Sequence, residues 1–254
     1  DEHGWDNDGI FNFEGGCYAK AYKLSKHAEP GIYKATGSFG SIVENVVMDP
    51  TTGYLDFYDD SITENGRSSY PLSFIDQIES SAQGSVPNNI FFLTADAFGV
   101  LPPVSKLTNA QAMFYFVLGY TAKLAGTEAG ITKPVATFSP CFGAPFMMRH
   151  PKVYADLLGE YIEKYNIQTW LINTGWTGGA SGAGGNRYQI AVTRQIIRDV
   201  QDGKAQNIKT ETDPIFGLQI PHKLPGVRSA TILFPQKAWK DSDIYTKQAQ
   251  SLAA

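Results

Sequence analysis

Cysteine is scarce in this sequence, because Cys17 and Cys141 are the only two among 254 residues. Two cysteines in a chain of this length do not build the disulfide framework that holds small secreted proteins together. We therefore expect a reducing, cytoplasmic environment. Unpaired cysteine is among the residue types most often buried, so we interpret both side chains as buried free thiols rather than reactive groups.

The sequence also lacks a large excess of one charge sign and any long apolar run. Its net charge is −4, from 21 Lys and Arg against 25 Asp and Glu. This balance gives no general attraction to nucleic acid or to an anionic membrane. No apolar run approaches the ~20 residues that cross a bilayer. We therefore expect neither partner, and an anionic substrate would need a few local Lys and Arg side chains.

The phosphate loop of many nucleotide-binding enzymes, G-x-x-x-x-G-K-[ST], does not occur in the 254 residues. Residues 1–20 nevertheless combine three features that suit a polyphosphate site. Asp1 offers a carboxylate for a divalent metal, the Gly15-Gly16 step lets a ligand approach the backbone, and Lys20 can face phosphate oxygens. From this pattern alone, a solvated lysine on a strand is an open alternative for Lys20.

Strand and helix patterns alternate along the chain, which predicts an α/β fold. Thr108 fits a helix N-cap, and His150-Pro151 opens another helix. Pro30-Gly31 suggests a short helical turn. The expected strands are 9–24 with a break at 15–16, 42–48, 54–58, 89–94 and 169–174. The expected helices are 109–118, 151–164 and 189–200, with a short amphipathic helix within 236–254.

The strands at 89–94 and 169–174 are apolar, and we expect both to be buried, the first on both faces. Asp96 follows the first of them at its carboxyl end. Ligands gather at such ends in open α/β sheets, but an acid there can equally cap a helix, and both interpretations stay open. The helix after Thr108 is expected to pack into the core through Ala110, Met113, Phe114, Val117 and Leu118.

Glycine and proline interrupt two segments, 119–142 and 175–187. The first has the broken composition of a mobile lid. The second runs from a buried strand through many glycines to Arg187, which makes a plausible nucleotide cradle. It has neither the phosphate-loop spacing nor a G-x-G-x-x-G pattern, so a floppy surface loop is the alternative.

Several long strings together resemble the ATP-type phosphoenolpyruvate carboxykinases, in the segment that follows the phosphate loop of that family. The resemblance covers nearly the whole chain and weakens after about Pro235. It is carried by residues 1–20, TENGR at 63–67, FLTADAFGVLPPVS at 92–105, TAKLAGTE at 121–128 and NTGWTGG at 173–179.

The resemblance implies a mixed-sheet mononucleotide-binding domain of the phosphoenolpyruvate carboxykinase type over residues 1–254, with a lid near 119–142. It implies decarboxylation and phosphorylation of oxaloacetate to phosphoenolpyruvate and CO2, with ATP and Mn2+ or Mg2+, in gluconeogenesis or in the reverse, CO2-fixing direction. The residues that it implicates are Asp1 as a metal ligand, Lys20 and Arg67 as catalytic groups, Arg67 also as a substrate ligand, and Glu29, Arg67, Arg187, Tyr188 and Thr193 as nucleotide ligands.

By the same comparison, the family's N-terminal domain and phosphate loop lie outside these 254 residues. We therefore expect the chain to be the C-terminal part of a longer enzyme, which needs the upstream part for turnover. One alternative is a catalytically inactive nucleotide-binding module, which would bind ATP with manganese but form no product. Another is a structural or protein-binding domain, suggested by the 13 tyrosines and 15 phenylalanines.

Overall fold

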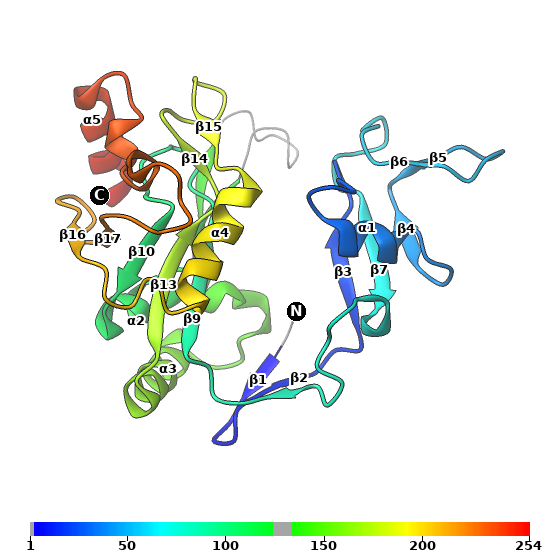
Figure 1. Cartoon of the computed structure of the whole chain (residues 1–254), viewed down its shortest axis with the longest axis horizontal. Helices are drawn as coiled ribbons and strands as arrows, with labels where there is room; N and C mark the ends of the chain where they lie inside the picture. The colour runs from blue at the N-terminus through cyan, green and yellow to red at the C-terminus, as the bar shows by residue number, and fades with distance from the viewer. Residues whose placement is uncertain (1–2, 124–133) are drawn as a thin grey trace. The chain divides into compact units, whose positions relative to one another are not determined.

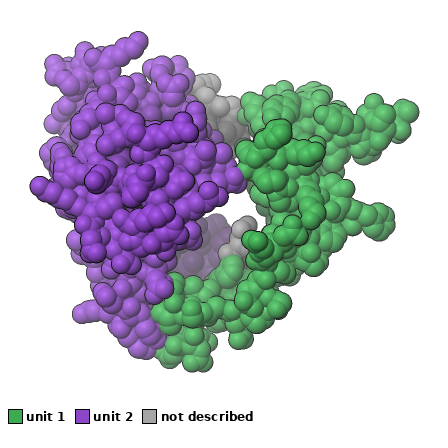
Figure 2. Space-filling model, viewed as in Figure 1, with its two compact units in different colours: residues 1–87 green, residues 88–254 purple. Residues whose placement is uncertain are grey.

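The computed structural model describes residues 3–123 and 134–254. The chain divides into two compact units, residues 1–87 (unit 1) and residues 88–254 (unit 2), which Figure 2 colours separately. Each unit has its own sheets and its own buried cluster, so each is described by itself. In the described ranges, no helix combines the length and the apolar character needed to cross a membrane.

Unit 1 is built from short antiparallel strands (Figure 1). One three-stranded sheet has the order β1-β2-β8, another has the order β3-β7-β4, and β5 pairs with β6 as a hairpin. The elements are β1 (His3–Trp5), β2 (Ile10–Asn12), β3 (Gly16–Lys20), α1 (Pro30–Thr36), β4 (Ile42–Glu44), β5 (Val47–Met48), β6 (Leu55–Asp56), β7 (Arg67–Pro71), η1 (Leu72–Phe74) and β8 (Gln83–Gly84).

The core of unit 1 is small. Its hydrophobic cluster has Ala21, Leu24 and Phe57 as buried members, and partly buried side chains from α1, from β6 and from Val46 just before β5 pack around them. The short helix after Pro30 and the 47–56 hairpin confirm two expectations. The strand expected over 42–48 is divided, because Asn45 adopts a positive φ of 56° and interrupts it.

Unit 2 contains a five-stranded mixed sheet with the order β16-β17-β10-β13-β9. Strand β13 (Gln168–Asn173) lies between two neighbours, parallel to β9 (Asn89–Thr94) and antiparallel to β10 (Val104–Leu107). The strands β16 (Thr210–Thr212) and β17 (Gln219–Pro221) complete the sheet on the side of β10. This arrangement confirms the predicted α/β fold with a mixed sheet.

Helices cover both faces of this sheet (Figure 1). Along β13, Trp170 and Ile172 point into the cluster that α4 covers, while Leu171 points into the cluster that α2 and α3 cover. Because successive side chains of a strand point to opposite faces of the sheet, β13 contributes to both hydrophobic clusters. The helices are α2 (Asn109–Leu118), α3 (Pro151–Tyr165), α4 (Ile190–Gln201) and α5 (Ser242–Ala253).

Two smaller hairpins and four 3-10 helices lie in the connections of unit 2. The hairpins are β11 (Tyr120–Lys123) with β12 (Val135–Phe138), and β14 (Trp176–Thr177) with β15 (Asn186–Arg187). The 3-10 helices are η2 (Pro140–Phe142), η3 (Ala144–Phe146), η4 (Ala230–Leu233) and η5 (Pro235–Lys237).

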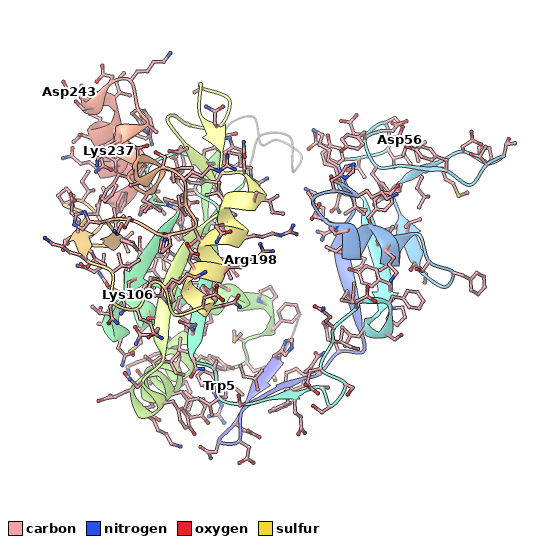
Figure 3. All side chains as sticks on the ribbon, viewed as in Figure 1. Trp5, Asp56, Lys106, Arg198, Lys237 and Asp243 are labelled. Carbon is pink, nitrogen blue, oxygen red and sulfur yellow. The ribbon has the colours of Figure 1, made fainter. Side chains whose placement is uncertain are left out.

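Helix boundaries in unit 2 follow the predicted caps. The Thr108 hydroxyl accepts from the Gln111 backbone N–H, and the Gln111 side chain accepts from the Thr108 N–H, which forms a capping box. His150 Nδ1 accepts from the Lys152 N–H at the start of α3. Arg198, labelled in Figure 3, is exposed on α4, and the same helix buries Ile196 and Val200.

Two burial predictions are wrong in unit 2. Strand β9 pairs on one side only among the described strands, and Leu93 on it is 56% exposed, so the strand is not buried on both faces. On α2 the buried residues are Ala112 and Tyr115, whereas Phe114 is 59% exposed. The buried face of α2 therefore includes Tyr115 and not its neighbour Phe114, so the predicted apolar stripe is offset by one residue from the face that packs on the sheet.

Candidate functional site

The residues predicted to hold phosphate lie side by side on the β3-β7-β4 sheet of unit 1. Lys20 on β3 is directly opposite Arg67 on β7, and Arg67 is directly opposite Glu44 on β4. Because side chains of directly opposed residues lie about 5 Å apart at Cβ, two cations and a carboxylate form a row across the sheet. Lys20 and Glu44 are exposed and Arg67 is half-buried, so this face is open to solvent.

Tyr18 lies on the same face of the sheet as this charged row and contacts two of its members, Arg67 and Glu44. The Arg67 guanidinium carbon lies 5.5 Å from the centre of the Tyr18 ring, and the Tyr18 hydroxyl donates to the Glu44 carboxylate. The Arg67 Nε donates to Asn65 Oδ1 at 3.1 Å. The aromatic contact and this one hydrogen bond fix the plane of the guanidinium. The N–H donors of its two terminal nitrogens are not used by the hydrogen bond to Asn65.

Sequence reasoning missed Tyr18 and Glu44. Tyr18 carries a local signal, since it is two residues before Lys20 and therefore shares its face of the strand. Glu44 carries none, because its place beside Arg67 depends on the pairing of residues 42–44 with residues 67–69. Strand register between segments more than 20 residues apart is not visible in either segment alone.

Glu29, predicted to bind nucleotide, is the residue that precedes the first turn of α1 and is half-buried. Its side chain makes no capping hydrogen bond, and within residues 3–123 and 134–254 no hydrogen bond or ion pair joins it to Lys20 or Arg67. Its carboxylate is therefore not committed to that row of charges. The role of Glu29 at a nucleotide stays a prediction.

In unit 2, the loops that follow the parallel strands β9 and β13 are bound to each other. Asn173 Oδ1 accepts from the backbone N–H of Asp96 at 3.0 Å and of Gly175 at 2.8 Å, while Asn173 Nδ2 donates to the Leu101 carbonyl at 2.9 Å. A Cβ on Gly175 would lie 2.1 Å from the Asp96 carbonyl oxygen. The glycine permits an approach that any side chain would block.

Asp96 is the organising carboxylate of the first of these loops, rather than an exposed catalytic acid. Its side chain is 0% exposed and accepts from the backbone N–H groups of Phe98 at 2.8 Å, Val100 at 2.7 Å and Leu101 at 2.9 Å. The Tyr120 hydroxyl donates to it at 3.3 Å. Burial raises the pKa of the Asp96 carboxyl above its ordinary value, although these four donors favour the charged form.

The glycine-rich segment after β13 forms an antiparallel hairpin. Strands β14 and β15 pair Trp176 with Arg187, and the Arg187 guanidinium carbon lies 5.2 Å from the centre of the Trp176 ring. Arg187 Nε donates to the Thr174 carbonyl at 3.1 Å, so an exposed cation is held next to the carboxyl end of β13. This strand pairing is inconsistent with the alternative, an irregular surface loop.

Tyr188 and Thr193 follow Arg187 but differ from it in exposure. Tyr188 is only 6% exposed, its N–H donates to the Gly175 carbonyl at 2.8 Å, and burial raises the pKa of its phenol. Its ring is thus part of the interior of unit 2 and presents no open stacking face. Thr193 is half-buried in the first turn of α4. Their nucleotide roles stay predictions.

Two predicted features fall outside the described residues: Asp1, the expected metal ligand, and the part of the expected lid at 124–133. In the parts of the chain that the structure describes, no group of three or more His, Cys, Asp or Glu side chains could hold a metal ion. The structure brings Lys20 and Arg67 together in unit 1. Their convergence with Arg187 of unit 2 stays a prediction.

Comparison with known proteins gives one consistent result. The family model described as phosphoenolpyruvate carboxykinase matches residues 1–230. A phosphoenolpyruvate carboxykinase (ATP) of Azorhizobium caulinodans is 53% identical over 254 residues, which is 100% of this chain and 47% of the relative. Proteins of the same name from Parvibaculum lavamentivorans and Geotalea uraniireducens are 53% and 52% identical over 252 residues, each 99% of this chain and 47% of the relative. The chain therefore spans about half the length of the curated relatives that it matches.

Proposed function

Because the chain belongs to the phosphoenolpyruvate carboxykinase family, we propose that it supplies the phosphoryl-transfer half of an ATP-dependent phosphoenolpyruvate carboxykinase. In this reaction oxaloacetate loses CO2, and the C–C bond electrons form the enolate of pyruvate. The enolate oxygen then attacks the γ-phosphorus of ATP, the bond to the bridging oxygen breaks, and phosphoenolpyruvate and ADP result.

The observation that carries this proposal is the direct opposition of Lys20 and Arg67 on neighbouring strands. Like charges directly opposite each other destabilise a sheet, so the pair costs stability unless an anion lies between the two side chains. A phosphoryl group in transfer spreads negative charge over its equatorial oxygens and suits such a pair. Arg67 keeps its charge when water is excluded, and its planar fork can also hold a carboxylate of the substrate.

We propose separately that unit 2 carries nucleotide ligands of its own. Arg187, fixed on Trp176, would meet the nucleotide from the carboxyl end of β13, with Thr193 nearby on α4. Glu29 and Tyr188 are further proposed nucleotide ligands. Divalent metal, when bound, neutralises phosphate charge, with Asp1 as one proposed ligand.

We propose in addition that residues 119–142 close over the nucleotide as a lid. The support is the antiparallel stem of β11 and β12, in which Tyr120 is opposite Phe138 and Lys123 is opposite Val135. Thr94 at the end of β9 donates its hydroxyl to the Tyr120 carbonyl at 2.7 Å, so the stem begins at the carboxyl end of β9. Closure there would exclude water from the enolate.

The test is product formation. The 254-residue chain is mixed with the portion of the Azorhizobium caulinodans relative that it does not span, and phosphoenolpyruvate is measured with oxaloacetate, ATP and MnCl2. We expect Lys20→Ala and Arg67→Ala each to lower kcat/KM by about 10²–10³-fold, as for removal of one transition-state donor. Lys247→Ala and Arg228→Ala, which remove exposed cations of unit 2, serve as matched controls.

Two results would contradict the proposal. Equal activity of the Arg67 variant and its control would show that the paired cations are not the phosphoryl site. Saturable ATP binding by the chain, with no product in any mixture, would instead indicate a nucleotide-binding module without turnover. Calorimetric titration with ATP and MnCl2 measures that binding directly.

A further inference from the structure

Arg67 has an acidic neighbour that should compete with any anionic ligand. Glu44 is directly opposite Arg67 in the β4-β7 pairing, and both side chains lie on the open face of the sheet. An Arg–carboxylate pair at this separation readily forms two parallel hydrogen bonds. Such a pair would occupy the terminal guanidinium nitrogens, which are the groups that a phosphate would use.

The structure shows Glu44 bonded to a different residue. The Tyr18 hydroxyl reaches across β7 and donates to Glu44 Oε1. No ion pair joins Glu44 to Arg67 within residues 3–123 and 134–254, and the only hydrogen bond that the Arg67 side chain makes there is from Nε to Asn65. The hydrogen bond to Glu44 is the main cause of a raised pKa at Tyr18, so the phenol remains a proton donor at neutral pH.

Tyr18 is placed to act on both partners at once. Its ring lies under the guanidinium, 5.5 Å from the Arg67 carbon, and its hydroxyl holds the carboxylate. The ring and the hydroxyl are separable by mutation, because Tyr18→Phe keeps the aromatic contact and removes only the donor. Tyr18 is 51% exposed and lies outside the small core of unit 1, so this change should not affect folding.

We infer that Tyr18 is a positioning residue that holds the Glu44 carboxylate away from Arg67, so that the terminal nitrogens of Arg67 stay available for a phosphate-bearing ligand. This rests on the proposed function of Arg67 as a phosphoryl ligand. The role belongs to the phenolic hydroxyl rather than to the ring. Glu44 in turn is an internal competitor, which takes Arg67 when the hydroxyl is removed.

The experiment measures binding of inorganic pyrophosphate to the 254-residue chain by isothermal titration calorimetry at low ionic strength. Tyr18→Phe should raise the Kd about three- to fivefold, the range expected when an exposed Arg–Glu pair must first be broken. Glu44→Gln alone should not raise it. The double variant Tyr18→Phe/Glu44→Gln should bind within twofold of the starting chain, because the released competitor is no longer charged.

The matched control is Tyr54→Phe, which removes another exposed phenolic hydroxyl of unit 1 and should leave the Kd unchanged. A merely structural role for Tyr18 would not be rescued by a change at Glu44, so a weakened Tyr18→Phe that stays weak in the double variant overturns the inference. So does an unchanged Kd for Tyr18→Phe. If Arg67→Ala itself leaves pyrophosphate binding unchanged, the proposed function of Arg67 fails instead, and the two failures are therefore distinguishable.

Discussion

The two units present their candidate functional residues in opposite ways. In unit 1 the charged row lies on the open face of a three-stranded sheet, and the hydrophobic cluster of this unit has three buried members. In unit 2 the residues that shape the loops are buried polar groups, anchored at the end of a sheet with helices on both faces. Strand register therefore positions the candidate residues of unit 1, whereas hydrogen bonds inside the protein position those of unit 2.

This difference predicts that mutations at the two places will separate stability from binding. A change to an exposed charge in unit 1 should alter binding with little effect on folding. A change to a buried polar residue in unit 2 should alter folding first.

The largest effect should come from Asp96→Ala. It leaves the N–H groups of Phe98, Val100 and Leu101 buried without their acceptor. We expect a loss of about 3 kcal/mol in the free energy of unfolding, since buried unsatisfied donors bear the full cost of desolvation. Chemical denaturation measures it, with Asp156→Ala in an exposed ion pair as the control. Equal stability of the two variants would show that the carboxylate does not organise the loop.

Gly175→Ala should have the next largest effect. A Cβ at this position would lie 2.1 Å from the Asp96 carbonyl oxygen, so the two loops must separate. We expect a destabilisation of about 2 kcal/mol, in the range of overpacked interiors. The control is Gly31→Ala in α1 of unit 1, where a Cβ meets nothing within 4 Å. A melting temperature for Gly175→Ala that matches the control would contradict the close approach of the loops.

The thiols of Cys17 and Cys141 should differ in their rates of alkylation, because one is more exposed than the other. Cys17 of unit 1 is half-buried and lines a cavity of about 700 Å³, whereas Cys141 of unit 2 is buried, and burial raises the pKa of its thiol. Alkylation by iodoacetamide at pH 8 should therefore be roughly tenfold slower at Cys141. Mass spectrometry of timed digests gives both rates, and similar rates after complete denaturation serve as the control.

The smallest effect should be a gain in stability. Lys20→Met removes the repulsion between Lys20 and Arg67 while keeping a long side chain on the strand. We expect unit 1 to gain about 0.5 kcal/mol in the absence of anions. The gain should shrink when pyrophosphate is added, since only the starting chain has both cations to bind it. Destabilisation by Lys20→Met would argue that the two cations do not oppose each other across the sheet.

Much of the fold follows from the sequence, because its determinants are local. The Thr108 cap, the helix after His150-Pro151 and the buried strand at 169–174 were predicted from periodicity and end signals, and the structure confirms them. Leu93 and Phe114 were predicted as buried and are exposed. An apolar stripe identifies an amphipathic element but not which neighbour covers each side chain.

The candidate site was less predictable from its residues. Strings in the sequence pointed to Lys20 and Arg67, but only the strand pairing places them opposite each other. Asp96 could be read as catalytic or as a capping acid, and the choice depends on three backbone donors that its own loop brings back to it. Such contacts arise from folded backbone geometry, which the order of residue types does not specify.

The β11-β12 stem has a practical consequence for protein engineering. Lys123 and Val135 are paired across the ladder, so the ends of the intervening segment are held at the spacing of adjacent strands. Loop-closure entropy grows slowly with length, and doubling a flexible connection between fixed ends costs only about 0.6 kcal/mol. A peptide tag or a fluorescent reporter inserted between these two positions would therefore leave the sheet of unit 2 assembled and would place a probe beside the proposed nucleotide end.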